Sequence, residues 1–181
     1  MAITPMGRSY DLLQAEDVVV VDHEMEAVEG ELAPSSESLL HVAVYSRRPD
    51  VGAVVHTHAV YSSVAAVASL EIPPIIDEMV VAVGGPVHVS EYAFPGTPEL
   101  ADNVCAALGE RNAALIGNHG AVGVGRDLRE AVDVCVLTER AAQIFVLSSL
   151  LGKAGVLPEE VVEAETAIFR MRARVADPGP E

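Results

Sequence analysis

The sequence predicts an α/β domain in which helices cover a mostly antiparallel sheet. Half of the 181 residues are hydrophobic, which is enough to bury the core of a single domain spanning residues 1–181. Tryptophan is absent and aromatic residues make up only 4% of the chain, so the core depends on small and β-branched side chains, which suit helices packed closely on a sheet. Strand-like and helix-like segments alternate, and several strand-like segments are separated by short turns, which favours antiparallel pairing.

The elements of the first quarter of the chain follow from local patterns. A β-branched run predicts a strand at residues 17–21. Acidic residues and Gly30 interrupt any period over residues 23–33, which predicts an exposed loop. Pro34-Ser-Ser-Glu37 then has the pattern of a helix start, and the apolar positions that follow predict a helix as far as Arg48, where a Pro-Asp pair ends it.

The remaining elements are predicted in the same way. Residues 51–58 read as a second strand, and the alanine-rich residues 59–70 read as a helix. Further along the chain we expect short strands at 79–83 and 87–90, a helix from Thr97 to Leu108, strands at 113–116 and 121–124, a long helix over 128–151 and a last helix over 158–175.

Charge and cysteine content exclude several classes of protein. Lysine and arginine number 11 against 27 aspartates and glutamates, for a formal net charge of −16, and such a surface repels nucleic acid. Cys105 and Cys135 each lie in an apolar helical pattern, which predicts free thiols in a reducing compartment. No apolar run approaches the roughly 18–20 residues of a membrane span, and the first residues lack a secretory signal pattern. We therefore expect a cytoplasmic protein with no membrane partner.

A candidate metal site begins with His56-Thr57-His58 at the end of a predicted strand. Side chains two residues apart on a strand point to the same side, so the two imidazoles converge. Neutral imidazole is a good ligand for Zn²⁺, but a catalytic zinc usually takes three protein ligands. His119 is the candidate third ligand, because it lies between two predicted strands and is flanked by Gly117 and Gly120. Without His119, the His-x-His pair reads equally well as a core pair.

A second candidate site is the helix start at Pro34-Ser35-Ser36-Glu37. A helix N-terminus offers unpaired amide donors, and the two hydroxyls add more, so this segment can hold an anion. Plain capping of the helix is the alternative interpretation. The helix leads directly to the histidine strand, so Glu37 is placed to face the open position of a metal ion.

Several motifs occur together in the order of a known family. They are Ile3-Thr-Pro, Pro34-Ser-Ser-Glu37 with His41 four residues on, Arg48-Pro-Asp50, Val54-Val-His-Thr-His58, Gly84-Gly85, Gly96-Thr97 and Asn118-His-Gly120. In these motifs the chain resembles the class II aldolase/adducin family, from about Ile3 to the end of the long helix near Leu151. A set of spaced motifs in one order is far more specific than any one of them alone.

The resemblance implies a fold, an assembly and a set of roles. The implied fold is a three-layer α/β/α sandwich around a mainly antiparallel sheet, and the implied assembly is a homotetramer with active sites between subunits. The implied reaction is reversible cleavage of a ketose phosphate, such as L-fuculose 1-phosphate, to dihydroxyacetone phosphate and an aldehyde through a zinc-stabilised enediolate. The implied roles are zinc ligands for His56, His58 and His119 (with Mn²⁺ or another divalent ion as alternatives), catalytic acid/base for Glu37, and phosphate binding for Ser35, Ser36 and the amide of Gly7.

The chain also departs from the pattern of this family. Met1 precedes the Ile3-Thr-Pro turn directly, so the family's N-terminal helix and first strand or strands are expected to be absent. Asp77 stands where fucose-type aldolases place a tyrosine, which makes Asp77 a further candidate catalytic residue.

Other functions remain open at this stage. An epimerase, a dehydratase or a decarboxylase of a related hydroxy-carbonyl compound can use the same scaffold, because each can proceed through a metal-stabilised enolate. There are two non-catalytic alternatives. One is a catalytically silent, adducin-like assembly module, and the other is a truncated, inactive enzyme. Metal content separates an enzyme from a silent module.

Overall fold

A three-stranded antiparallel sheet forms the centre of the structure, a computed structural model that describes residues 1–22 and 24–176. Its strands are β4 (Ala53–Thr57), β6 (Gly120–Gly125) and β5 (Ala113–Ile116), in the order β4-β6-β5. The strands predicted at 51–58, 113–116 and 121–124 are thus confirmed, with ends that differ by a few residues. In the register of the β4–β6 pair, His56 lies opposite Val122.

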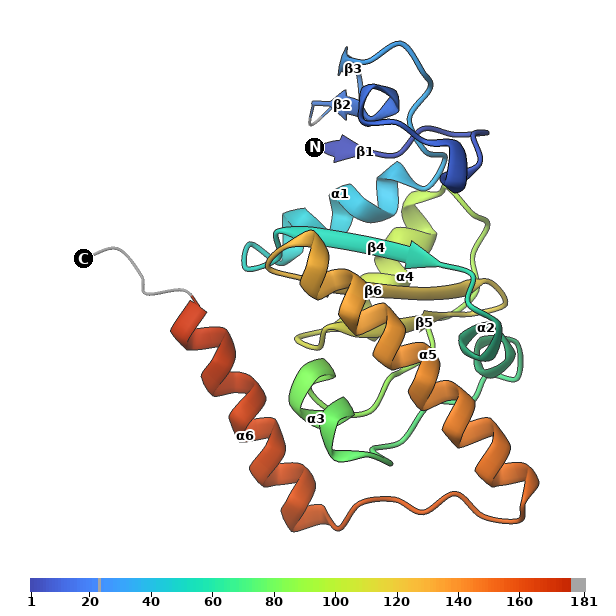
Figure 1. Cartoon of the computed structure of the whole chain (residues 1–181), viewed down its shortest axis with the longest axis vertical. Coiled ribbons are helices and arrows are strands. Elements are labelled where there is room, and N and C mark those ends of the chain that lie inside the picture. Colours follow the sequence, from blue (N-terminus) through green and yellow to red (C-terminus); the bar gives the residue numbers. More distant parts are fainter. Residues whose placement is uncertain (23, 177–181) are drawn as a thin grey trace.

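Helices cover both faces of this sheet, which confirms the expected α/β/α layering (Figure 1). One face carries α1 (Ser38–Arg47) and α4 (Pro98–Leu108), and its core includes Leu40, Val44, Leu100, Val104, Ile116 and Val122. The other face carries α2 (Val60–Val67), α3 (Asp77–Val83) and α5 (Leu128–Leu150), and its core includes Ala65, Ala66, Met79, Val83, Leu115, Val134 and Ala141. Neighbouring strand residues point to opposite faces, so Leu115 and Ile116 belong to different cores.

The structure confirms the predicted cap of α4 and shows a further one, not predicted, at the start of α5. The Thr97 side chain accepts a hydrogen bond from the Leu100 amide at 3.2 Å and so starts α4, as its Thr-Pro-Glu sequence predicts. Asp127 does the same for α5 by accepting from the Glu130 amide at 2.8 Å. Both helices end within one residue of the expected positions.

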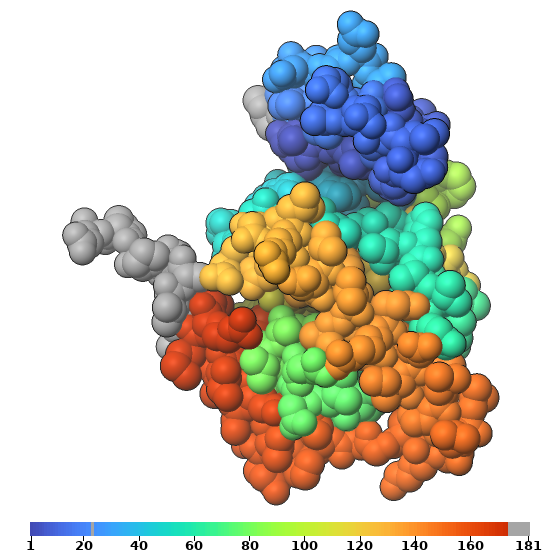
Figure 2. Space-filling view, viewed as in Figure 1, coloured from blue at the N-terminus to red at the C-terminus, as the bar shows by residue number. Residues whose placement is uncertain are grey.

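The N-terminal residues form a cap at one end of the molecule (Figure 2), and this cap contains a second, smaller sheet (Figure 1). It consists of β1 (Ala2–Ile3), β2 (Val19–Val21) and β3 (Ala27–Glu29), with short 3-10 helices at Tyr10–Leu12 and Ala15–Asp17. The expectation of a loop throughout residues 23–33 is wrong for β3, which pairs with β2; residue 23 itself lies outside the described residues. All three β3 side chains are exposed, so no apolar alternation marks this strand in the sequence.

The prediction of a strand at residues 79–83 is also wrong, because this segment belongs to α3. Met79, Val80 and Val83 are buried at helical spacing, and Asp77 and Glu78 lie in the first turn. Tertiary packing here overrides the preference of valine for strands. Residues 87–90 form two isolated bridges rather than a strand, one from Val87 to Ile72 and a parallel one from Val89 to Leu115.

The last helix, α6 (Glu159–Ala176), is confirmed and packs along α3. A methyl group on Gly84, which ends α3 with φ +96°, would lie 2.6 Å from the Phe169 ring of α6, so the Gly84-Gly85 motif allows this close approach.

Both cysteines are free, as expected. Among the helices described, none combines the length and apolarity that crossing a bilayer requires.

Candidate metal centre and active site

The His-x-His pair lies at the carboxyl end of β4, with both side chains on one side of the strand. The Nε2 atoms of His56 and His58 are 2.9 Å apart. The Nδ1 atom of His56 lies 2.9 Å from the carbonyl oxygen of Ala121 on β6, which can only accept a hydrogen bond. His56 therefore carries its proton on Nδ1, and Nε2 is left as an acceptor that can bind a metal ion.

The structure brings His119 to the same point from the turn between β5 and β6. The ring centroid of His119 lies 4.8 Å from those of both His56 and His58. One nitrogen from each ring falls within 4.8 Å of the others. The preceding residue, Asn118, has φ +56°, a left-handed conformation that asparagine tolerates better than most residues. Gly120 follows, and a Cβ there would lie 2.2 Å from the Thr57 carbonyl oxygen.

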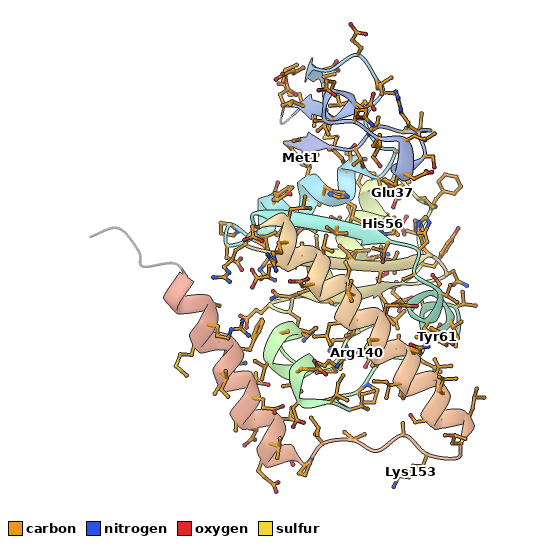
Figure 3. The ribbon with its side chains drawn as sticks, viewed as in Figure 1. Met1, Glu37, His56, Tyr61, Arg140 and Lys153 are labelled. Atoms are coloured by element: carbon orange, nitrogen blue, oxygen red, sulfur yellow. The ribbon has the colours of Figure 1, made fainter. Side chains whose placement is uncertain are left out.

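Glu37 faces this group of histidines from the residue just before α1 (Figure 3). Its Oε2 atom lies 3.5 Å from His56 Nε2 and 3.9 Å from His119 Nε2. Ser35 holds the segment in place, since its hydroxyl accepts a hydrogen bond from the Glu37 amide at 3.2 Å. Glu37 Oε2 and His119 Nδ1 are buried and have no hydrogen-bond partner among the described residues. A buried carboxylate oxygen with no donor is costly, so this arrangement favours a bound cation or substrate.

Burial lowers the pKa of two of the three metal-site imidazoles, those of His56 and His119. It lowers the pKa of His56 to about 4 from the ordinary value of 6.5, although the hydrogen bond to Ala121 opposes this effect. Burial also lowers the pKa of His119, against the opposing charge of Glu37. His41, one helical turn after Glu37, is partly buried, and desolvation lowers its pKa to about 4. A neutral imidazole keeps the lone pair that a metal ion needs.

These residues fit a divalent metal ion. Three converging imidazoles are the protein ligands of many catalytic zinc sites, with one further position left for water or substrate. Glu37 is close enough to contact a group in that position. In the described part of the chain, one group of histidine, cysteine or carboxylate side chains lies close enough together to hold an ion. It consists of His56, His58 and His119.

The N-terminal turn and the two serines lie side by side. The Ser35 amide donates to the Thr4 carbonyl at 3.1 Å, and the Met6 amide donates to the Ala33 carbonyl at 2.9 Å. Gly7 follows directly, is exposed and has φ +76°. Ser36 is exposed, and its hydroxyl makes no hydrogen bond among the described residues. The structure thus places these candidate phosphate-binding groups in neighbouring segments next to Glu37.

Asp77 lies elsewhere within this chain. It is the first residue of α3, and its carboxyl group lies near that of Glu165 on α6, whose pKa is raised by desolvation and by the neighbouring Asp77. The described structure does not bring Asp77 to the three histidines.

A surface hollow of about 600 Å³ opens beside His58. Its other lining residues belong to α2 and are mainly apolar: Val60, Ser63, Val64, Val67 and Ala68. Sequence reasoning missed this hollow, because a run of alanines and valines in an amphipathic helix predicts a core. It also missed the Ala121 carbonyl, since a backbone acceptor carries no side-chain signal.

Comparisons with known proteins agree on one family. The family model described as Class II Aldolase and Adducin N-terminal domain matches residues 1–146. The 5-deoxy-D-ribulose 1-phosphate aldolase of Bacillus thuringiensis is 35% identical over 164 residues, covering 90% of this chain and 76% of that protein. The L-fuculose phosphate aldolase of Escherichia coli K12 is 34% identical over 171 residues, covering 94% and 79%. A solved L-fuculose 1-phosphate aldolase structure has a TM-score of 0.89 at 36% identity, covering 94% and 80%.

Proposed function

Since the chain belongs to the class II aldolase and adducin family and is, like these relatives, a carbon–carbon lyase, we propose that it cleaves a short deoxyketose 1-phosphate. The products would be dihydroxyacetone phosphate and a small aldehyde. The observation that carries the proposal is the buried Glu37 carboxylate oxygen, which faces three converged histidines and has no hydrogen-bond partner in the described part of the chain.

His56, His58 and His119 would hold the metal ion, which we propose is zinc. A bound divalent cation supplies Lewis-acid stabilisation of the negative charge that develops on substrate oxygens. The protein contributes three converging imidazoles, and the Ala121 carbonyl fixes the ring of His56.

Glu37 would be the acid and base of the reaction. In the direction of synthesis its carboxylate removes a proton from the hydroxymethyl carbon next to the ketone of dihydroxyacetone phosphate. In the direction of cleavage the same group returns that proton after the carbon–carbon bond breaks. The role needs a carboxylate within reach of the carbon and shielded from water, and the Glu37 side chain is only 12% exposed.

The substrate phosphate would bind beside Glu37. The hydroxyls of Ser35 and Ser36 and the amide of Gly7 are donors in adjacent segments, and the start of α1 adds the positive end of a helix dipole. The phosphorylated end of the ketose would then lie on the α1 side of the histidines.

The other end of the substrate would lie towards α2. The hollow beside His58 is walled by Val60, Val64 and Val67, which suit a methyl or short alkyl end better than a hydroxymethyl end, because a hydroxyl without a partner is costly in apolar surroundings. The substrates named for the relatives, a 5-deoxyribulose phosphate and a fuculose phosphate, both end in a methyl group.

We further propose that the chain assembles as a homotetramer. Apolar side chains are exposed along α5, with Val136 at 63% and Leu150 at 78%, and a second copy of the chain is the occupant that would cover them. Light scattering on the eluting protein should give a mass close to four chains. A single-chain mass at micromolar concentration would contradict this assembly.

The test of the proposed function is a substrate panel assayed for release of dihydroxyacetone phosphate. We expect release from 5-deoxy-D-ribulose 1-phosphate and L-fuculose 1-phosphate, weaker release from D-ribulose 1-phosphate, and none after treatment with a chelator until a divalent cation is restored. No release from any ketose 1-phosphate by metal-loaded protein would overturn the proposal. Inversion of a substrate stereocentre without release would indicate an epimerase instead.

A further inference from the structure

We propose that Glu139 on α5 is a positioning residue for the metal centre, which it serves by fixing α2 and, through α2, both His58 and His119. The inference rests on the proposed function only in that the three histidines bind a metal ion. Glu139 does not touch the histidines in the described contacts, so its effect would be indirect.

The first step is the anchoring of α2. This helix begins two residues after His58, and its N-cap residue, Ala59, has no side chain that can accept a hydrogen bond. Glu139 supplies the missing acceptors from the neighbouring helix. One carboxylate oxygen accepts from the Tyr61 amide, and the other accepts from both the amide and the hydroxyl of Ser62, each at 2.8 Å. Figure 3 labels Tyr61 on α2, close to α5.

These bonds are stronger than ordinary capping bonds. Hydrogen bonds to an ionised group in a partly buried place are shorter and stronger than neutral ones, and Ser62 is only 1% exposed. The negative carboxylate also lies at the positive end of the α2 dipole. The start of α2, and with it the turn that carries His58, is therefore tied to α5.

The second step links α2 to His119. The Ser63 hydroxyl lies 3.3 Å from the His119 carbonyl oxygen, to which it donates. The Asn118 amide approaches the Ala66 carbonyl at 3.4 Å. Two turns of α2 therefore contact the loop that presents the third histidine, and a shift of α2 would move two of the three metal ligands.

The third step is that His56 is held by contacts that do not involve Glu139. It lies within the β4–β6 pair, and its ring bonds to Ala121. One turn before Glu139, the Cys135 thiol lies 3.5 Å from the Val55 carbonyl and donates to it, so α5 contacts the strand before the site as well. Loss of Glu139 should thus displace His58 and His119 relative to a His56 that stays in place.

The experiment compares Co²⁺ binding by the full chain in three variants. Glu139→Ala removes all the acceptors, and Glu139→Gln keeps one acceptor oxygen and the side-chain volume. Glu130→Gln is the matched control, because Glu130 caps the far end of the same helix and pairs with Arg126 at 2.9 Å. Co²⁺ is measured by competition with a chelator and by its visible spectrum, which reports the geometry of the ligands, and thermal unfolding is recorded for every protein.

We expect Glu139→Ala to bind Co²⁺ about tenfold more weakly, the low end of the range for residues that orient metal ligands, and to show a changed visible spectrum. Glu139→Gln should show the same changes to a smaller degree. Glu130→Gln should melt earlier but keep the affinity and spectrum of the parent. The melting comparison separates positioning from a general loss of stability.

The inference is overturned if both Glu139 variants bind Co²⁺ with the parent's affinity and spectrum, whatever their melting temperatures. It is also overturned if Glu130→Gln weakens Co²⁺ binding equally. If Glu139→Ala does not fold, Glu139→Gln decides the question alone by the same criteria. Failure of the parent chain itself to bind Co²⁺ would instead remove the proposed metal-dependent function.

Discussion

The Oε2 atom of Glu37 lies 3.5 Å from His56 Nε2, and it is buried without a hydrogen bond or a lysine or arginine partner among the residues that the structure describes. As the proposed acid and base, this carboxylate would exchange a proton with the substrate. We therefore expect Glu37→Gln to keep the metal ion but to lose about 10²–10⁴-fold in the exchange of the dihydroxyacetone phosphate proton with deuterium from solvent. The measurement is loss of the proton resonance in deuterated buffer. Exchange by Glu37→Gln at the parent rate would remove Glu37 from the mechanism.

Replacement of His58 should have the opposite effect to Glu37→Gln, because it removes a metal ligand rather than the group that transfers the proton. We expect the parent to retain about one metal ion per chain after dialysis. His58→Ala should retain far less, because two imidazoles make a weak site. Elemental analysis of the purified proteins gives the ratio. His88→Ala is the control, because His88 pairs with Glu71 at 2.6 Å outside the site. Parent-like metal content in His58→Ala would contradict the ligand assignment.

The two serines should separate phosphate binding from helix capping. Ser36 is exposed and makes no hydrogen bond in the described structure, whereas Ser35 accepts from the Glu37 amide. We expect Ser36→Ala to raise KM for a ketose 1-phosphate with unchanged stability, since a hydrogen bond to a charged group contributes about 1.5–3 kcal/mol, or about tenfold or more.

For Ser35→Ala we expect a raised KM together with a loss of about 0.5–2 kcal/mol in the free energy of unfolding, because a cap is lost. Steady-state kinetics and urea unfolding on both variants check this pair. Equal KM values for parent and Ser36→Ala would place the phosphate away from this helix start.

Gly120 should not tolerate any side chain. A Cβ at this position would lie 2.2 Å from the Thr57 carbonyl and 3.1 Å from the His58 ring. Gly120→Ala must therefore push β4 and β6 apart, at a cost of about 1–3 kcal/mol or more, and it should weaken metal binding as well. Gly155→Ala is the matched control, because nothing lies within 4 Å of a Cβ there, and its effect should stay within about 0.5 kcal/mol. Similar melting temperatures for the two variants would refute this packing argument.

Part of the histidine site could be predicted from the sequence, because the relation of His56 to His58 depends on local geometry, whereas His119 reaches them through the long-range pairing of β4 with β6. Alternation along a strand fixes the relation of His56 to His58, and the glycines around His119 mark a strand-end turn. The position of Glu37 relative to them is a tertiary relation, and the resemblance to a family supplied it. In contrast, the helix at 79–83 could not be predicted from local preference, because contacts with α5 and α6 decide its conformation.

The contacts that support the site left little trace in the sequence. Glu139 looks like any surface glutamate on a long amphipathic helix, and only the fold brings its carboxylate to the start of α2.

The Arg48-Pro-Asp50 motif was predicted to end a helix, which it does. Its larger role lies in long-range bonds from the Arg48 guanidinium to the carbonyls of Gly109 and Arg111, each at 2.9 Å.

The same motif predicts how stability depends on pH. Arg48 donates to both oxygens of Asp50, at 2.8 and 2.7 Å, and these bonds hold the pKa of the Asp50 carboxyl below its ordinary value of 3.8. A carboxyl group whose pKa is lower in the folded chain stabilises the fold above its unfolded pKa, and this contribution is lost as the pH falls through the folded pKa. We therefore expect Asp50→Asn to lower the free energy of unfolding at neutral pH, with a difference from the parent that shrinks below pH 3.8.

Urea unfolding of the parent and Asp50→Asn between about pH 7 and about pH 3 measures this difference. Asp133→Asn is the control, because Asp133 is exposed on α5 and has no ion pair among the described residues, so its curve should follow the parent at every pH. Because Arg48 also bonds to Gly109 and Arg111, loss of Asp50 frees the guanidinium from one partner but not from the chain. A stability difference that stays constant down to the lowest pH would show that Asp50 acts through packing rather than through its charge.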